Sequence, residues 1–417
     1  MPRTQTVRNI NCERKSDKMI KVAVLGYGTV GSGVVQVIQD NNGLIAERLG
    51  SPMEVRYILD LREFPGDKNE QLVVHDVNVI MDDPEVTIVC ETMGGVGAAY
   101  EFTKTALGKG KSVCTSNKEL VEKHGPELIA LARKNKCNYL FEASVGGGIP
   151  IIRPMNTSLA QEHIESIMGI LNGTTNYILT KMDREGADYS DVLKQAQELG
   201  YAERDPEADV EGHDAGRKIA ILASLMTGKT VRYEDIYVEG ITAIESVDFA
   251  FAGAMDRTVK LIARVSDRNG EIEAIVAPHM ISADHPLSGV NDVFNAVYVT
   301  GNMLGDVMFY GKGAGKLATA SAVVSDVMDI ARADMNGVSL PCTWGEGSLK
   351  PVDHKKCEGC FFLRVRDAEA EAMKGAVDGL KEVGSISGWT GFVTGSMTEE
   401  TLDKAVAGVD HKMIRLL

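Results

Sequence analysis

Short apolar runs alternate with segments of helical spacing over the first 150 residues of the chain. Between the runs, SGVVQVIQDN (32–41) and YEFTKTALGKG (100–110) repeat apolar residues at helical intervals. The runs themselves are predicted strands: KVAVLG (21–26), EVRYILDL (54–61), VTIVCETMG (86–94) and SVCTSNKE (112–119). Strands that alternate with helices in this way predict an open parallel sheet, with its ligand crevice at the carboxyl ends of the strands.

The pattern becomes mixed from residue 151 to about residue 300. Strands are predicted at 164–171 and 271–278, and helices at 189–200 and 213–228, whereas AMDRTVKLIARVSD (254–267) fits either. A glycine turn then enters an apolar helix at 310–331. This turn is not a P-loop, because Leu317 follows Lys316 and Tyr310 stands where the first glycine should be.

The last part of the chain, residues 355–417, predicts a separate unit. CFFLRVRD reads as a strand, AEAEAMKGAVDGLKEVG (368–384) as a helix and SGWTGFVTGSM as one or two strands. TEETLDKAVAGV then reads as a helix and HKMIRLL as a final strand. This β-α-β-β-α-β order resembles an ACT domain, a ferredoxin-like module that commonly binds amino acids, so an amino-acid effector is a possible ligand.

Composition narrows the class of protein. With 417 residues the chain exceeds the usual size of one domain, and its 43 glycines and 6% aromatic residues favour an α/β enzyme. The net charge of −15 argues against nucleic acid and anionic membrane surfaces as partners. An anionic ligand would therefore need local positive charge from a few lysines and helix N-termini.

The same composition predicts a cytoplasmic protein. No run approaches the roughly 18 apolar residues of a membrane span. The first 18 residues lack the apolar region of a secretory signal and are expected to be a disordered tail. Seven cysteines without disulfide-framework spacing fit a reducing compartment, and a single CxxC with an irregular set of neighbours makes a zinc site unexpected.

A glycine-rich turn follows the first strand and opens the first helix. The spacing Gly26-x-Gly28-x-x-Gly31 predicts dinucleotide binding, with Gly26 for the tight turn, Gly28 for the approach to the pyrophosphate and Gly31 for helix packing. Asp60, at the end of the second strand, suits the ribose of NAD. Arg62 suits the 2′-phosphate of NADP instead, so the choice between the two coenzymes stays open.

Acidic and basic residues gather around one junction between a loop and a helix. Asp214 and Lys218 are four residues apart on a predicted helix, hence on one face, and Lys218 is a candidate general acid. The preceding loop carries five acidic residues, of which Glu203 is the first, and such a loop suits an α-ammonium group. The alternative is a solvated loop beside a surface ion pair of little energetic value.

These motifs together resemble homoserine dehydrogenase. The resemblance extends from about Ile20 to Ala333 and rests on GYAERDP, HDAGRK and three further segments: TSNKELV (115–121), FEASVGGGIPIIRPM (141–155) and GILNGTTNYIL (169–179). It implies reduction of L-aspartate 4-semialdehyde to L-homoserine with NADPH or NADH, in threonine, methionine and isoleucine biosynthesis. It also implies a homo-oligomer, either a dimer or a tetramer.

The resemblance also implies roles for individual residues. The proton donor is Lys218, assisted by Lys118, and Asp214 orients the substrate. Substrate binding falls to Glu203, Asp214, Gly173 and Thr174, the glycine and threonine lying in a predicted turn that offers N–H and hydroxyl groups to the substrate carboxylate. The implied contacts to the cofactor are Gly26, Gly28, Thr29, Val30, Gly31, Thr92, Lys118 and Gly313. Without the resemblance, Lys118 would read as an exposed lysine at the start of a helix.

A cation site is implied in FEASVGGGIP, where a strand is followed by three glycines and a proline. Hard cations prefer oxygen ligands, and an irregular turn can point carbonyls inward. The resemblance implies a sodium-type site made by the Glu142 side chain or carbonyl and the carbonyls of Val145, Gly147 and Ile149. The alternative is a hinge to the substrate domain without a metal.

The sequence thus predicts three parts and one leading activity. A Rossmann domain (19–150, completed by 310–335) precedes an α+β catalytic and dimerisation domain (151–309) and the ACT-like unit (355–417). One alternative is another Rossmann oxidoreductase that acts on an amino-acid semialdehyde or imine. A second is a sensor that binds a dinucleotide and an amino acid without catalysis, although a sensor needs no proton donor.

Overall fold

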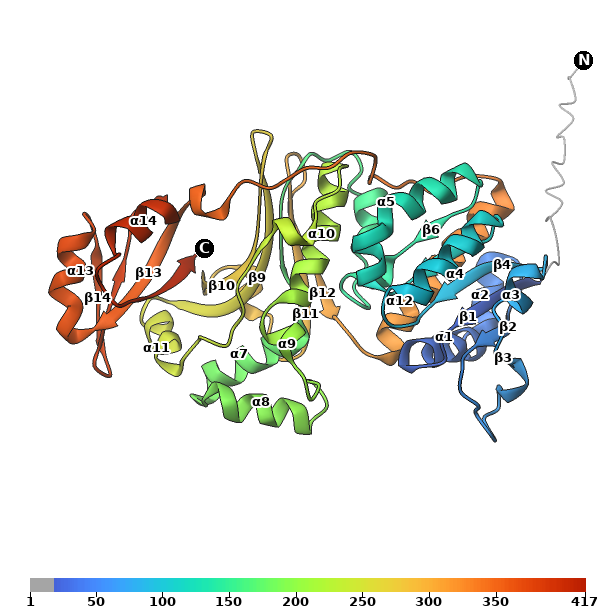
Figure 1. Cartoon of the computed structure of the whole chain (residues 1–417), viewed down its shortest axis with the longest axis horizontal. Coiled ribbons are helices and arrows are strands. Elements are labelled where there is room, and N and C mark those ends of the chain that lie inside the picture. The colour runs from blue at the N-terminus through green and yellow to red at the C-terminus, as the bar shows by residue number, and fades with distance from the viewer. Residues whose placement is uncertain (1–18) are drawn as a thin grey trace, which may run out of the picture.

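A computed structural model describes residues 19–417, and the tail expected at 1–18 lies outside the described residues. Three parts follow one another along the long axis of the molecule (Figure 1). The N-terminal domain lies at one end, a mixed sheet occupies the middle, and the C-terminal unit forms the other end. Within residues 19–417 no helix has the length and apolar character needed to cross a membrane.

The N-terminal domain is a doubly wound parallel sheet. Its strand order, β3-β2-β1-β4-β5-β6, is the Rossmann order 3-2-1-4-5-6, which confirms the predicted fold class. The strands are β1 (Ile20–Leu25), β2 (Met53–Leu59), β3 (Val73–Val74), β4 (Val86–Glu91), β5 (Ser112–Thr115) and β6 (Tyr139–Leu140). The helices are α1 (Thr29–Asp40), α2 (Asn42–Leu49), α3 (Asn78–Asp82), α4 (Gly97–Gly108) and α5 (Lys118–Lys134).

A late helix returns to this domain. Helix α12 (Lys316–Asn336) packs against α1 (Figure 1), and its residues Ala320, Val323 and Val327 share one core with β1 and β2. The two helices touch at Gly33, where an added Cβ would lie 2.8 Å from the carbonyl oxygen of Lys316. The glycine turn before α12 is therefore held next to the first helix of the N-terminal domain.

The middle of the molecule is built on a mixed sheet. Strands β12-β11-β7-β9-β10 pair in antiparallel fashion, and the segment that fitted either helix or strand is strand β9, paired on both sides. The strands are β7 (Ile164–Ile170), β8 (Tyr237–Val238), β9 (Arg257–Arg268), β10 (Glu271–Ser282), β11 (Phe294–Gly301) and β12 (Gly305–Lys312). The helices are α6 (Ile152–Asn156), α7 (Gly173–Glu185), α8 (Tyr189–Glu198), α9 (Glu207–Val210), α10 (His213–Thr227) and α11 (Ser246–Ala254).

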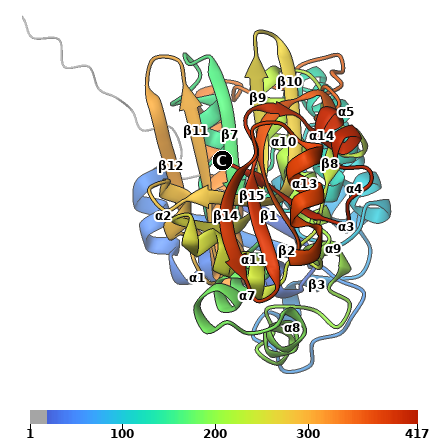
Figure 2. The same cartoon turned by 90° about the vertical axis from the view of Figure 1, so that its left-hand side faces the viewer.

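The C-terminal unit has a ferredoxin-like strand order. Its sheet runs β17-β13-β15-β14, and Figure 2 views this unit from its own end of the molecule. Apolar side chains of α13 and α14 pack with those of β13 in one small core. The elements are β13 (Glu358–Arg366), α13 (Ala370–Ala376), β14 (Lys381–Ile386), β15 (Trp389–Val393), β16 (Met397–Thr398), α14 (Glu399–Ala405) and β17 (Lys412–Leu416).

The helix predicted over 368–384 is wrong in its second half. Helix α13 ends at Ala376, and Gly379 has a left-handed φ of +75°, which turns the chain before β14 begins. Residues Lys381–Ile386 then pair with β15. Local helical spacing failed here because strand pairing decides the conformation of this segment.

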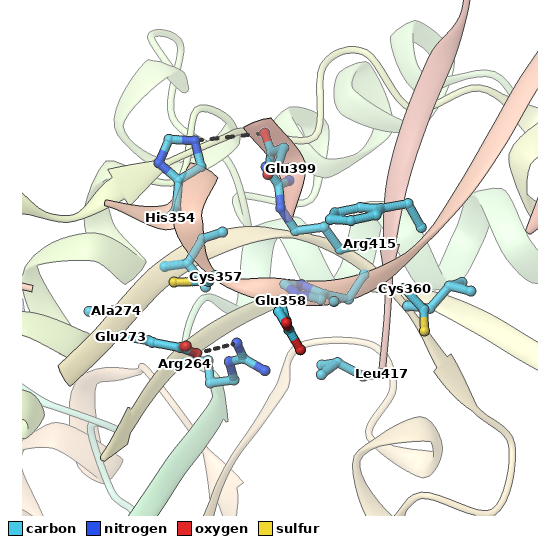
Figure 3. Close-up of a pocket in the computed structure, with 15 residues that line it drawn as sticks. Arg264, Glu273, Ala274, His354, Cys357, Glu358, Cys360, Glu399, Arg415 and Leu417 are labelled. Atoms are coloured by element: carbon cyan, nitrogen blue, oxygen red, sulfur yellow. Dashed lines mark hydrogen bonds and ion pairs between the residues drawn. The ribbon is translucent and has the colours of Figure 1, made fainter. Parts of the chain in front are cut away.

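The C-terminal unit and the middle sheet form one continuous sheet. Strand β17 pairs with β10 in parallel, so the combined sheet has 11 strands. Arg415 of β17 binds Glu239 at 2.6 Å and Glu399 at 2.8 Å, which joins the two parts by charge. Figure 3 shows the small cavity at this junction, with Arg264 turned toward Glu273 and His354 toward Glu399.

This junction shows no arrangement for a metal. Cys357 and Cys360 both line the cavity (Figure 3), yet no cluster of three or more His, Cys, Asp or Glu side chains able to hold a metal ion occurs in residues 19–417. Burial raises the pKa of Cys357 to about 12, which keeps this thiol protonated. The charged side chains at the junction instead form ion pairs with one another.

His279 of β10 gives the junction a measurable pH dependence. Its side chain is buried, and burial, together with the charges of Arg264 and Arg415, lowers its pKa to about 3. The unfolded chain binds a proton near pH 6.5 and the folded chain does not, so stability falls as the pH drops from about 6.5 to 3, by up to about 1.4 kcal/mol per pH unit. When the free energy of unfolding is measured with urea at several pH values, it should fall less steeply with decreasing pH for His279→Asn than for the wild type.

Replacing the exposed His163 by asparagine is the matched control for this measurement. The fall in stability of His163→Asn should follow that of the wild type. Equal pH slopes for His279→Asn and the wild type would show that His279 does not contribute to the acid sensitivity of the fold.

Candidate active site

A large cavity opens between the N-terminal domain and the middle sheet. Its volume is about 770 Å³, and its walls come from α1, α5, α7, α10 and the turn before α12. Nine of the residues predicted for the site line it: Val30, Lys118, Gly147, Gly173, Thr174, Glu203, Asp214, Lys218 and Gly313. Segments far apart in the sequence therefore meet at one candidate active site.

A carboxylate shared by two lysines lies at the centre of this cavity. Asp214, in the first turn of α10, places one oxygen 2.6 Å from the Nζ of Lys218 and the other 2.9 Å from the Nζ of Lys118. The side chains of Asp214 and Lys218 are only 8% and 12% exposed. The alternative of a solvated surface pair is therefore excluded, and the two lysines are held at a fixed separation.

The charges of this group reinforce one another. Burial by itself would raise the pKa of Asp214, but the charges of Lys218 and Lys118 hold that pKa well below its usual range. The charge of Asp214 in turn raises the pKa of Lys118. The cavity as a whole is lined by four lysines and three carboxylates, Lys118, Lys218, Lys312 and Lys316 against Glu203, Asp209 and Asp214. This leaves one net positive charge in the cavity of an otherwise acidic protein, which favours anionic ligands.

Asn172 anchors the group from the adjacent helix. It caps α7 by accepting the N–H of Thr175 at 2.9 Å, and its Nδ2 donates to Asp214 at 2.9 Å and to Asp209 at 2.7 Å. Burial raises the pKa of Asp209. Asn172 was not predicted as a site residue, although asparagine immediately before a helix is a recognisable capping signal. Asp209 was included only as one of the five acidic residues of the loop expected to suit an α-ammonium group.

The turn predicted at Gly173 and Thr174 is the first turn of helix α7. The hydroxyl of Thr174 donates to the carbonyl of Tyr201 at 2.6 Å, and the hydroxyl of Thr175 is bonded to Asn172. The backbone N–H groups of Gly173 and Thr174 stand at the N-terminus of a 13-residue helix that borders the cavity. Such groups have no partner within the helix and attract a carboxylate.

Glu203 lies on the loop between α8 and α9 and lines the cavity with an exposed side chain. The backbone of this loop is fixed by Gln197, whose side-chain amide donates to the carbonyl of Glu203 at 3.0 Å. The carboxylate of Glu203 makes no ion pair with another residue among 19–417, in contrast to that of Asp214. It is therefore the freer of the two acids for a cationic group of a ligand.

The glycine turn at the start of α1 is shaped for a dinucleotide. A Cβ added at Gly31 would lie 1.8 Å from the carbonyl oxygen of Gly26, so this position requires glycine, whereas a Cβ at Gly28 would meet open space. The hydroxyl of Thr92 donates to the carbonyls of Leu25 at 2.9 Å and Gly26 at 3.0 Å. Thr92 thus supports the turn from the end of β4, and it is not among the residues that line the cavity.

The acidic residue at the end of β2 is tied to the same turn. The carboxylate of Asp60 accepts the backbone N–H of Tyr27 at 2.8 Å and two bonds from the guanidinium of Arg62, both at 3.0 Å. The side chain of Arg62 remains 62% exposed. Asp60 and Arg62, the two alternatives for coenzyme recognition, are therefore joined in one ion pair.

The predicted cation segment has free carbonyls but an occupied carboxylate. Residues Glu142–Ser144 form a 3₁₀ turn and not a strand. The side chain of Glu142 accepts three backbone N–H groups, at 2.6, 2.9 and 2.6 Å, from the start of α6. Among residues 19–417 no donor is bonded to the carbonyls of Glu142, Val145, Gly147 and Ile149, which suit a hard cation as ligands.

Known proteins similar to this chain agree on one family. The family model for the homoserine dehydrogenase NAD binding domain matches residues 26–142, and the model for homoserine dehydrogenase matches residues 150–328. Homoserine dehydrogenase of Bacillus subtilis is 44% identical over 356 residues, which are 84% of this chain and 82% of the relative. That of Synechocystis is 46% identical over 318 residues, 75% and 73% of the two chains.

Solved structures give the same result. A homoserine dehydrogenase from Thiobacillus denitrificans has a TM-score of 0.87 and 32% identity, and the match covers 96% of this chain and 98% of that one. A hyperthermophilic archaeal homoserine dehydrogenase in complex with NADPH has a TM-score of 0.64 and 29% identity, over 75% and 97% of the chains. The predicted resemblance is confirmed: the chain belongs to the homoserine dehydrogenase family of NAD(P)-dependent oxidoreductases.

Proposed function

We propose that the cavity between the two sheets is the active site in which L-aspartate 4-semialdehyde is reduced to L-homoserine. The observation that supports this most strongly is the buried group of Lys118, Asp214 and Lys218 in a cavity that also includes Val30 of the glycine turn. A proton donor beside a dinucleotide site is the minimum requirement for reducing a carbonyl. The product would enter threonine, methionine and isoleucine biosynthesis.

The substrate is a zwitterion, and the cavity offers a group for each of its charges. Its carboxylate would bind the free N–H groups of Gly173 and Thr174 at the N-terminus of α7. Its ammonium would bind Glu203, whose carboxylate has no competing ion pair in the described chain. Asp214 would orient the substrate through the two lysines that it holds.

One N–H of the Lys218 ammonium would be free to donate its proton in the reaction. An ammonium carries three N–H donors, and two of those on Lys218 are used, toward Asp214 at 2.6 Å and the carbonyl of Leu171 at 2.7 Å. The third would point to the aldehyde oxygen and donate its proton to the alkoxide as the carbon–hydrogen bond forms. Lys118 would stabilise the same oxygen by its charge. When bound, the coenzyme supplies the hydride.

The coenzyme would lie along the glycine turn and the turn before α12. The residues that would hold it are Gly26, Gly28, Thr29, Val30, Gly31, Thr92, Lys118 and Gly313. The open space beside Gly28 and the N-terminus of α1 suit a pyrophosphate. Both NAD and NADP would be accepted, with Asp60 facing the ribose and Arg62 the 2′-phosphate.

Removing Arg62 tests this coenzyme assignment. Its guanidinium is exposed beside Asp60, so Arg62→Ala should lower kcat/KM with NADP by about tenfold, the loss of one charge-assisted hydrogen bond, and leave kcat/KM with NAD unchanged. Arg56→Ala, an exposed arginine on β2, is the control. An equal loss with both coenzymes would place the 2′-phosphate elsewhere.

A sodium-type ion would bind the carbonyls of Glu142, Val145, Gly147 and Ile149. This segment touches the turn before α12, since a Cβ added at Gly147 would lie 2.3 Å from the carbonyl oxygen of Gly313. The ion would therefore stabilise the wall of the active site without taking part in the chemistry.

The protein would act in the cytoplasm as a homo-oligomer, a dimer or a tetramer. Strand β12 is an edge of the large sheet, and it exposes Met308 and Tyr310, next to Met303 and Leu304 in the preceding turn. These apolar groups offer a surface for a second copy. The ferredoxin-like unit would bind an amino-acid effector, as its strand order suggests.

Oxidation of homoserine at alkaline pH, followed through the absorbance of the reduced coenzyme, tests the proposed function. The wild type should form reduced coenzyme with NAD and with NADP when homoserine is added. Binding of coenzyme without turnover of homoserine would contradict the proposal and favour the sensor or another amino-acid oxidoreductase.

A further inference from the structure

Asn295 is a buried polar residue on the wall of the active site. It is 1% exposed, lies at the start of β11, and lines the cavity that contains Lys118, Asp214 and Lys218. Its Oδ1 is buried and has no hydrogen-bond partner within the described part of the chain. A buried amide oxygen without a hydrogen-bond partner carries an uncompensated desolvation cost, and a ligand that donates a hydrogen bond to it would remove that cost.

Asn295 interrupts the apolar pattern of the buried face of β11. Along β11 the side chains of Val297 and Val299 follow at the two-residue spacing of one sheet face, and both belong to the hydrophobic core. A valine-like residue would continue that pattern at 295. Packing alone therefore does not explain an asparagine there.

Two glycines give the amide its space. A Cβ added at Gly313 would lie 2.1 Å from both Cγ and Nδ2 of Asn295, and one added at Gly173 would lie 3.4 Å from Oδ1. Neither glycine has a left-handed φ, so backbone conformation does not require glycine at either position. The Asn295 amide lies between the turn before α12 and the N-terminus of α7, the two places assigned above to coenzyme and substrate.

We propose that the Asn295 amide hydrogen-bonds the carboxamide of the nicotinamide ring and so fixes which face of the ring meets the substrate. The two charged groups of the substrate already have partners, the ammonium in Glu203 and the carboxylate at the N-terminus of α7. A neutral amide is the natural partner of a neutral carboxamide, whose NH₂ supplies the donor that Oδ1 lacks. The torsion next to the amide is soft, so rotation about it can bring Oδ1 to the cavity that the residue already lines.

Asn295 would therefore be a positioning residue for the coenzyme. This role rests on the proposed function, because the cavity must receive the nicotinamide ring. The test compares NADP with an analogue in which an acetyl group replaces the carboxamide, so that the C=O stays and the NH₂ is lost. Calorimetry gives Kd for each coenzyme without any turnover, in the wild type and in Asn295→Val and Asn295→Ala.

We expect the wild type to bind the carboxamide coenzyme about tenfold more tightly than the acetyl analogue, the value of one good hydrogen bond. Both variants should bind the two coenzymes equally. Asn295→Val should also melt at a higher temperature than the wild type, because it removes a buried unsatisfied group and continues the valine pattern. A residue with a purely structural role would instead lower the melting temperature on replacement.

The control is Val297→Ala, which makes a cavity on the same strand face and should keep the tenfold preference. The inference is overturned if the variants of Asn295 still prefer the carboxamide coenzyme, if the wild type shows no preference, or if the KM for homoserine changes in place of the coenzyme preference. Failure of the proposed function is a separate result, since the wild type would then bind coenzyme and not oxidise homoserine.

Discussion

Lys218→Ala is expected to lower kcat for homoserine oxidation by about 10³-fold, the contribution of a well-placed general acid or base. The physical reason is that Lys218 is the buried ammonium with one free N–H, while Lys118 is more exposed and is held by the other oxygen of Asp214. Steady-state kinetics with saturating coenzyme measures this loss, and the Kd for coenzyme should be unchanged.

Chemical rescue makes this prediction sharper. A small primary amine added to Lys218→Ala can occupy the vacated space and carry the proton, so part of the rate should return in proportion to amine concentration. Lys181→Ala, which removes a half-buried lysine of α7 that does not line the cavity, is the matched control and should retain wild-type kinetics. Near-normal turnover by Lys218→Ala would remove Lys218 from the role of proton donor.

Asp214→Asn is expected to damage both stability and activity. The carboxylate is buried and is the shared counter-charge of two lysines, so its neutralisation leaves two like charges close together in a low-dielectric site. Breaking such a buried pair typically costs about 3–5 kcal/mol in the free energy of unfolding. Urea denaturation measures the cost, and Glu207→Gln at the exposed start of α9 is the control.

The pH dependence of this cost has a defined sign. The pKa of Asp214 is lower in the folded chain than in the unfolded chain, so its contribution to stability is complete above the unfolded value, about 3.9, and declines as the pH falls toward the folded value. The stability gap between the wild type and Asp214→Asn should therefore be constant near neutral pH and narrow below about pH 4. A gap that widens in acid would mean that the carboxylate is protonated in the folded protein.

Much of the fold could be predicted because the apolar pattern matched the burial of each element. The central strands β1 and β4 of the parallel sheet are largely buried and read as short apolar runs. The glycine turn after β1 has a spacing dictated by close contact between Gly31 and Gly26. The helix over 368–384 failed because residues Lys381–Ile386 form an edge strand whose conformation depends on a partner distant in space.

The active site could be predicted only where its geometry is local. Asp214 and Lys218 are one helical turn apart, so their contact follows from sequence spacing. The contact of Lys118 with the same carboxylate joins two domains, and without a known family it would not have been proposed. Asn295 was missed because the lack of a hydrogen-bond partner for its Oδ1 is visible only in the folded chain, where its amide lies beside Gly173 and Gly313.

We expect the reduced coenzyme bound in this cavity to supply hydride to the aldehyde carbon of L-aspartate 4-semialdehyde, and Lys218 to supply the proton. The most direct test gives the wild type and Lys218→Ala the semialdehyde with reduced coenzyme deuterated at C4 of the nicotinamide, and analyses the product by mass spectrometry. The wild type should form homoserine with one deuterium on carbon 4, and Lys218→Ala should form almost none in the same time. Homoserine without deuterium, or equal yields from the two proteins, would contradict the account.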